Sequence, residues 1–401
     1  MTLDLLKVGP RVAEMARDAA DRGGWHRARL TESREIVRRL AGSWEELAEI
    51  AIGTADRRLP KPLEPLDTHV AAPSVPRDHV VIATDGSQIE PDRHGVGDYF
   101  LINVGWAVVR YGEEPFAELS SQPRLYYGPD ETYITHITAQ STRRVPIQDR
   151  HLSAKRSVEE LKQAANLTTE WNDAGLPLTV LADGTLALWV LEERPGDFLR
   201  KALVEPYVEQ LQRIRDLDRP LASYVSRPRA NDVSALLHAG GCSGLLDGCS
   251  GLLDGCEACA TVADELCIFD HLADRDLFGW LAPGERSALF EMTLPAGLTE
   301  FYGDLVPRFF YLNVGSEIAR VEVPPWTAED PAHLGQVQAV ILDQCDKGLG
   351  YPNVLARADK QAVVTVQDRQ AFAYLHDALL AREGVQPRTS EKLHSKRVWA
   401  V

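Results

Sequence analysis

Two aspartates, each between an apolar run and a glycine, are the residues of this chain best suited to metal chemistry. Asp85 follows the apolar run of HVVIATDGS, and Asp183 ends the run of LTVLADGTL. Such runs predict buried strands that carry an acid to the strand end, and Gly86 and Gly184 allow a sharp turn after each acid. Adjacent carboxylates repel, so a shared divalent cation is the natural way to keep both ionised. An Asp-Gly pair is also an ordinary turn signal, which is the alternative for each site alone.

A third acid is expected if a metal is bound, because hard cations take several oxygen ligands. Glu159 and Glu160 lie on the predicted helix that precedes the second strand. The apolar face of this helix centres on Val158 and Leu161, so Glu160 lies on its flank and Glu159 points nearly opposite. Glu160 is therefore the better candidate, and a solvent-facing acid is the alternative.

Tyr351 and Asp359 bracket one short predicted helix and lie about two turns apart on one side of it. A tyrosine hydroxyl can bond a phosphate oxygen or an attacking water, and the aspartate could add a metal ligand. A Tyr-Pro turn followed by an exposed acid is the alternative interpretation.

Arg227 and Arg229, in the segment SRPRA, follow a predicted strand. Paired guanidinium groups suit phosphate oxygens, so these two residues are candidates for nucleic-acid binding. Surface arginines are common, and this is a weak signal. Further local positive charge comes from Arg143, Arg144, Arg150 and Arg156.

The apolar patterns predict a mixed α/β arrangement that would position these residues. Residues 79–127 are expected to form a meander of three strands, and a helix over 151–171 leads into the strand at 178–183. A hairpin turned at Gly315 is expected over 309–323. Other predicted helices span 199–217, 262–292 (with GERSALF beginning one helix), 333–345 and 368–382, and other predicted strands span 221–225 and 362–366, the run AVVTV.

The chain divides by composition into three parts. Residues 1–78 are expected to be an extension of two helices and a Pro-rich linker, 79–383 the α/β domain, and 384–401 a basic tail. A Gly- and Cys-rich duplication at 239–260 interrupts the domain. Its Cys256 and Cys259 have the C-x-x-C spacing of a metal half-site, although incidental free thiols are the favoured alternative.

The composition is that of a soluble globular protein, with 44% hydrophobic and 25% charged residues among 401. No apolar run approaches the ~18 residues of a membrane helix, and no secretory signal is apparent. A cytoplasmic location and reduced cysteines are therefore expected. The formal net charge of -16 argues against a general nucleic-acid coat. It is compatible with an enzyme in which metal ions and a local basic groove offset the bulk charge. There is no GxxxxGK[ST], G-x-S-x-G or H-E-x-x-H motif.

Taken together, the motifs resemble those of the NurA nuclease family. The stretches ATDGSQ, LADGTLALW, FYLNVGSEIARVEVPPW and YPNVLARAD occur in the family's order over roughly residues 79–380. The resemblance implies a ribonuclease-H-like mixed sheet with flanking helices and a bound Mn²⁺ or Mg²⁺. It also implies degradation of DNA from 5′ ends, on single strands and duplex ends, by homodimers that dock on the hexameric HerA translocase during double-strand-break resection.

By motif, Asp85 resembles the family's first metal-binding acid, Glu160 (less well Glu159) the second, and Asp183 the third. Tyr351 resembles the tyrosine of the family's Tyr-Pro motif.

This sequence departs from the family pattern at Asp359, which stands where the Tyr-Pro motif usually has a later histidine. An aspartate can ligate manganese but cannot donate a proton near neutral pH unless its pKa is strongly raised.

Three functions follow as hypotheses. The favoured one is a metal-dependent deoxyribonuclease with catalytic residues Asp85, Glu160, Asp183, Tyr351 and Asp359. A catalytically weak scaffold that binds the translocase or DNA ends is the second, and a metal–sulfur protein built on the Cys-rich loop is the third.

Overall fold

The computed structural model describes residues 4–53, 58–91, 98–191, 197–241 and 272–385. Its contacts divide the chain into two compact units. Unit 1 comprises Met1–Ala71, Ser226–Thr293 and Phe309–Arg320, and unit 2 comprises Ala72–Val225, Leu294–Arg308 and Val321–Val401. Each unit is thus assembled from segments that are distant in the sequence.

Unit 2 contains a mixed sheet with the strand order β9-β8-β3-β4-β5. Strands β3 (His79–Ile89), β4 (Tyr99–Tyr111) and β5 (Phe116–Tyr127) form an antiparallel meander, which confirms the three predicted strands. Strand β8 (Leu178–Asp183) lies parallel to β3, and β9 (Leu221–Val225) lies parallel to β8. Parallel strands are usually covered on both faces, and the apolar residues of β3 and β8 are accordingly almost completely buried.

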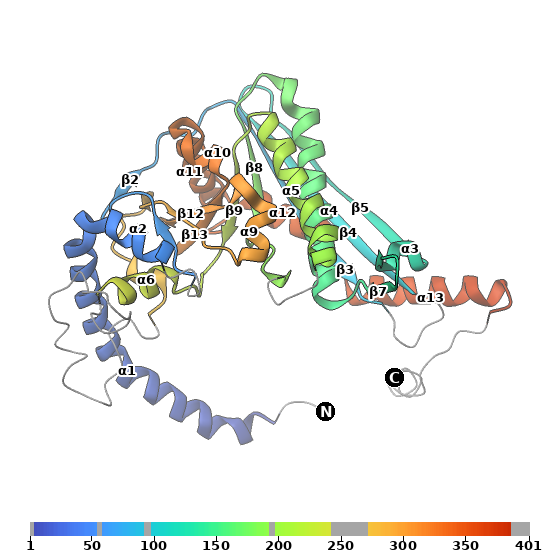
Figure 1. Ribbon diagram of the computed structural model, residues 1–401, viewed down its shortest axis with the longest axis horizontal. Helices are drawn as coiled ribbons and strands as arrows, with labels where there is room; N and C mark the ends of the chain where they lie inside the picture. The colour runs from blue at the N-terminus through green and yellow to red at the C-terminus, as the bar shows by residue number, and fades with distance from the viewer. Residues whose placement is uncertain (1–3, 54–57, 92–97, 192–196, 242–271, 386–401) are drawn as a thin grey trace. The chain divides into compact units, whose positions relative to one another are not determined.

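Helices flank this sheet. Helix α4 (Asp149–Trp171) packs on β3, and α5 (Asp197–Asp216) runs beside α4 (Figure 1). The mixed sheet with flanking helices confirms the predicted α/β class and is consistent with a ribonuclease-H-like fold. The other elements of unit 2 are α3 (Pro129–Thr132), β6 (Tyr133–Ile137), β7 (Thr142–Pro146), α9 (Ala296–Tyr302), α10 (Pro325–Glu329), α11 (Pro331–Lys347), α12 (Asn353–Ala362) and α13 (Val366–Arg382).

Helix α12 lies directly on the sheet because β4 has a glycine at the contact. A Cβ on Gly105 would be 2.3 Å from the backbone nitrogen of Ala362. The carbonyl of Ala362, at the end of α12, accepts hydrogen bonds from Asn103 Nδ2 at 2.8 Å and from Ser87 Oγ. Since the last carbonyls of a helix lack partners within the helix, these side chains both satisfy the helix end and fix α12 against β3 and β4.

Unit 1 begins with the two predicted helices, α1 (Leu5–Leu40) and α2 (Trp44–Gly53). The Pro-rich stretch that follows is extended and paired: β1 (Lys61–Pro62) pairs with β11 (Phe290–Glu291), and β2 (His69–Ala71) pairs with β10 (Glu285–Ser287). The remaining elements are α6 (Asp232–Gly241), α8 (Asp274–Leu277) and most of the hairpin of β12 (Arg308–Asn313) and β13 (Ile318–Val323), whose residues 308 and 321–323 belong to unit 2. Gly315 turns that hairpin at a φ of +87°, as predicted.

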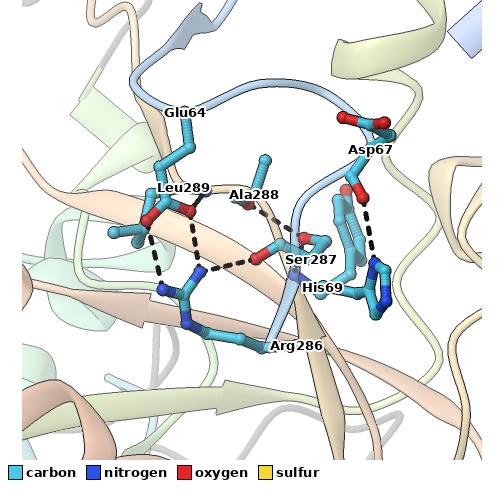
Figure 2. Close-up of polar contacts among 8 residues, drawn as sticks. Glu64, Asp67, His69, Arg286, Ser287, Ala288 and Leu289 are labelled. Carbon is cyan, nitrogen blue, oxygen red and sulfur yellow. Dashed lines mark hydrogen bonds and ion pairs between the residues drawn. The ribbon is translucent and has the colours of Figure 1, made fainter. Parts of the chain in front are cut away.

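The helix predicted to begin in GERSALF is wrong, because these residues form β10 and β11. Arg286 of β10 donates to both carboxylate oxygens of Glu64, at 2.8 and 3.1 Å, and the backbone of Leu289 donates to the same carboxylate (Figure 2). A run this short fits helical and strand spacing equally well, and pairing with residues far away in the sequence decides between them.

The strand predicted for AVVTV is also wrong. Ala362 ends α12, Val363 and Val366 are exposed, and Thr365 begins α13 with a capping box to Asp368. The β-branched residues suggested a strand, but the Thr-x-x-Asp cap signal determines the local structure.

Two further predictions concern residues that lie outside the described ranges. Cys256 and Cys259 lie outside the described residues, as does nearly all of the basic tail. Among the helices that the structure describes, none combines the length and the apolar character needed to cross a bilayer.

Candidate metal centre

The two aspartates singled out from the sequence occupy neighbouring positions on adjacent parallel strands. The register of β3 with β8 pairs Thr84 with Ala182, so Asp85 and Asp183 are the next residues along. Equivalent positions on neighbouring parallel strands point to the same face, and the strands lie about 4.8 Å apart. The two acids therefore lie side by side in unit 2, and the charge of Asp183 helps to raise the pKa of Asp85.

Gly86 does not make the predicted turn, and that expectation is corrected. Strand β3 continues past it to Ile89, whereas Gly184, with a φ of +80°, does turn the chain after β8. A Cβ on Gly86 would lie 2.3 Å from Oε1 of Glu160. Successive residues of a strand point to opposite faces, so Asp85 faces the α12 side while Gly86 leaves an opening on the α4 side. The glycine is needed so that the Glu160 carboxylate can approach the strand.

Glu160, on α4, is the third acid near the paired aspartates. The charges of Asp85 and Asp183, added to the larger effect of burial, raise its pKa to about 7, and Arg156 opposes the rise. Arg156 Nε lies 2.9 Å from Glu160 Oε1, but the two atoms are not aligned for a hydrogen bond, and that buried oxygen has no hydrogen-bond partner. Arg156 had been noted from sequence only as local charge, although its four-residue spacing from Glu160 is the signal of a helical ion pair.

Glu159 belongs to a different group of side chains. Its carboxylate lies 2.8 Å from Lys155 Nζ, and its charge contributes to raising the pKa of Tyr126 on β5. Contact with Lys155 and Tyr126 lowers the pKa of Glu159, although burial alone would raise it. The structure therefore brings Glu160, and not Glu159, to the paired aspartates.

Asp359 joins the cluster from α12. Burial is the main reason that the pKa of Asp85 rises to about 6, and the negative charges of Asp183 and Asp359 add to the rise. The backbone N–H of Gly86 donates to Asp85 at 2.7 Å and opposes it. Asp183 from β8, Asp359 from α12 and Glu160 from α4 are thus each close enough to Asp85 of β3 to interact with it electrostatically.

Tyr351 contacts the cluster directly. Its hydroxyl donates to Asp183 Oδ1 at 2.8 Å, and its ring meets the edge of Tyr224 at a centroid distance of 5.5 Å. Burial, together with the charge of Asp183 and this hydrogen bond, holds the pKa of Tyr351 well above its ordinary value. The phenol is therefore neutral and acts as a donor.

A buried glutamate that the sequence analysis missed holds the turn after Asp183. Glu322 on β13 accepts hydrogen bonds from Thr185 Oγ1 at 2.8 Å and from the Leu186 backbone at 2.9 Å. Tyr302 donates to the Leu186 carbonyl at 2.9 Å. These contacts fix the direction in which the chain leaves Asp183. Only the unusual presence of an acid within the apolar strand IARVEV could have signalled this role.

The donor set fits a hard cation. Carboxylate oxygens are the ligands that Mn²⁺ and Mg²⁺ prefer. Oε1 of Glu160 accepts no hydrogen bond, and Arg156 is the positive charge beside it, while Asp85 and Asp183 add negative charge that a cation would neutralise. Within the part of the chain that the structure describes, no group of three or more His, Cys, Asp or Glu side chains is already set at metal-binding distances. Arg156 and Tyr351, which contact Glu160 and Asp183, would have to adjust for all three acids to ligate one ion.

The predicted arginine pair lies in the other unit. Arg227 and Arg229 belong to unit 1, and both are exposed. The backbone N–H of Arg227 donates to Glu317 at 2.9 Å.

The family comparison covers the whole candidate site. The model described as the NurA domain matches residues 79–364, a span that contains Asp85, Glu160, Asp183, Tyr351 and Asp359. No curated protein matches the chain.

Proposed function

The chain belongs to the NurA family, a family of nucleases, and from that premise we propose that it is a metal-dependent deoxyribonuclease centred on Asp85, Glu160 and Asp183. The observation that carries the proposal is the placement of Asp85 and Asp183 at neighbouring positions on adjacent parallel strands. Glu160 of α4 approaches the same strand at Gly86, near enough for the charges of both aspartates to raise its pKa.

Asp85, Glu160 and Asp183 would hold Mn²⁺ or Mg²⁺, and Asp359 would offer a further oxygen ligand. When bound, such an ion lowers the pKa of an attacking water and stabilises the charge that develops on the leaving oxygen. Hydrolysis of the phosphodiester would then need from the protein chiefly the orientation of the substrate phosphate.

Tyr351 is suited to that orienting role. Its neutral hydroxyl already donates to Asp183, so it can redirect the same proton toward a phosphate oxygen or toward the water. Asp359 is exposed and stands where the family resemblance expects a histidine. A carboxylate at this position offers oxygen atoms that can hold a cation or accept a hydrogen bond.

The expected substrate is DNA, both as single strands and at duplex ends, with degradation beginning at 5′ ends. The net charge of -16 favours DNA delivery through a confined basic path and not by a broad basic surface. We therefore include in the proposal a homodimer fed by a HerA-like hexameric translocase, acting in the cytoplasm during double-strand-break repair.

A matched pair of adjacent glutamates tests the site. Purified protein should cleave 5′-labelled single-stranded DNA when Mn²⁺ is added and not in EDTA. Glu160→Gln should lower the rate by roughly a hundredfold, as expected when a metal ligand or its close support is lost. Glu159→Gln, one residue away on the same helix, should stay within about twofold of wild type. Equal loss in both variants would remove Glu160 from the site.

The replacement at Asp359 favours one second candidate, a catalytically weak scaffold that binds the translocase or DNA ends. It predicts co-sedimentation with the hexamer and no cleavage above the metal-free control. Metal-dependent turnover by the wild-type protein would exclude it.

A further inference from the structure

Three arginines in unit 1 line an open cavity of about 510 Å³. Arg34 comes from α1, Arg227 from the segment after β9, and Arg275 from α8. Asp276 and Glu317 also line this guanidinium cavity. Positive charge therefore converges here from three elements that are far apart in the sequence.

The acids of the cavity already have partners. Glu317 accepts hydrogen bonds from Ser226 Oγ at 2.8 Å and from the Arg227 backbone at 2.9 Å, and it lies 4.0 Å from Arg227 Nε. Asp276 lies 3.8 Å from Arg275 Nε.

Arg34 is the residue that points to a ligand. Its Nε is buried and has no hydrogen-bond partner, and a buried donor without a partner costs free energy. The guanidinium has room there because Gly279 has no side chain: a Cβ on Gly279 would lie 3.2 Å from Arg34 Nη2. The structure thus accommodates the Arg34 guanidinium and leaves its Nε–H without an acceptor.

We infer that the guanidinium cavity binds a phosphate group, supplied either by the backbone of single-stranded DNA or by a free phosphate or nucleotide. Planar guanidinium groups donate in pairs to phosphate oxygens, and Arg34 would give its unused donor to the deepest oxygen. The guanidinium of Arg227, whose side chain is 83% exposed, would contact the outer side. The cavity exceeds the size of one phosphate and leaves space for an attached sugar. The predicted pair of Arg227 with Arg229 is thereby revised to Arg227 with Arg34 and Arg275.

Binding measured without metal tests this inference independently of cleavage. The full-length protein in EDTA is titrated with fluorescently labelled single-stranded DNA at several salt concentrations, and separately with radiolabelled inorganic phosphate by equilibrium dialysis. Arg34→Gln is compared with Arg38→Gln. Arg38 lies one turn further along α1, its side chain is 70% exposed, and it pairs with Glu35 at 3.3 Å.

If DNA supplies the phosphate, Arg34→Gln weakens DNA binding about tenfold and lowers the salt slope by about one. Arg38→Gln stays within about twofold. If free phosphate is the ligand, wild type binds inorganic phosphate saturably, Arg34→Gln does not, and DNA affinity is unchanged. Wild-type behaviour of Arg34→Gln in both titrations would overturn the inference.

A second variant protects the test from a folding failure. Should Arg34→Gln lose its circular dichroism signal, Arg275→Gln replaces it, because Arg275 lies nearer the surface, with 38% of its side chain exposed. A loss of DNA or phosphate binding in Arg275→Gln supports the site. Unchanged binding of both probes contradicts it.

Discussion

Two buried carboxylates, one in each unit, have surroundings that differ in the number of donors they offer. Asp274 of unit 1 is fully buried and accepts hydrogen bonds from the backbones of Val233 and Ser234, at 3.0 and 2.9 Å, and from the Tyr311 hydroxyl at 2.8 Å. Two of these donors lie in the first turn of α6. Glu160 of unit 2 has a buried oxygen with no hydrogen-bond partner.

Burial raises the pKa of both groups, to about 6 for Asp274 and to about 7 for Glu160, and the remaining causes separate them. For Asp274 the charge of Asp232 adds to the rise and three hydrogen bonds oppose it. For Glu160 the guanidinium of Arg156 opposes the rise and the charges of Asp85 and Asp183 add to it. A buried acid with a full set of donors is part of the framework. An acid with an oxygen that accepts no hydrogen bond, next to two other acids and balanced by the cation Arg156, is suited to binding a metal ion.

The largest expected effect is a loss of DNA cleavage in a variant that remains folded. Asp85→Asn should reduce DNA cleavage by roughly a thousandfold, since the metal's contribution to the barrier is several kcal/mol. Its thermal midpoint should stay equal or rise, because a repelling charge is removed. Cleavage rates and circular dichroism melts measure the two effects. Near-normal cleavage, or unfolding, would place Asp85 in the framework with Asp274.

Asp274→Ala should show the opposite behaviour. It leaves two backbone donors at the start of α6 and one hydroxyl without a partner, so the free energy of unfolding should fall by about 3 kcal/mol. Cleavage per folded molecule should be unchanged. Urea titration measures the loss against the exposed control Glu209→Ala, which should stay within about 0.5 kcal/mol of wild type. A stable variant with impaired cleavage would reverse the assignment.

Metal should stabilise only the protein with an intact acid cluster. At a hundredfold excess over its dissociation constant, Mn²⁺ should add about 2.7 kcal/mol to the free energy of unfolding. The gain should vanish in Asp85→Asn and persist in Asp274→Asn. Chemical denaturation with and without Mn²⁺ provides the comparison, and a gain retained in Asp85→Asn would locate the ion elsewhere.

The smallest expected effect is a pH dependence that comes from Asp274 alone. Its pKa is about 6 in the folded state against 3.8 for the ordinary carboxyl, so the folded protein binds more protons between these values. Raising the pH through this window therefore lowers stability, and the penalty is complete above about pH 6. The stability of wild type relative to Asp274→Asn should fall by on the order of 2 kcal/mol from about pH 4 to about pH 7. A difference that is constant or rises with pH contradicts the shift.

The sequence was sufficient to place the paired aspartates. Apolar runs that end in Asp-Gly identified β3 and β8, and helical spacing favoured Glu160 over Glu159. These signals are local and repeat over several residues. The hairpin at Gly315 and the three-stranded meander were predictable for the same reason.

The wrong predictions concern residues whose structure depends on contacts with residues far away in the sequence. GERSALF forms strands because Arg286 bonds to Glu64 and β10 pairs with β2. No local sequence pattern indicates either contact. Gly86 was expected to turn the chain, yet its function depends on a glutamate from the other side of the sheet. The role of Arg34 likewise depends on Gly279, far along the chain.

A crystal soaked in Mn²⁺ and measured at the manganese absorption edge tests the central claim most directly. The account predicts an anomalous peak between the carboxylates of Asp85 and Asp183, within ligand distance of Glu160. An empty site at a Mn²⁺ concentration that supports cleavage, or a peak only elsewhere in the molecule, would contradict it.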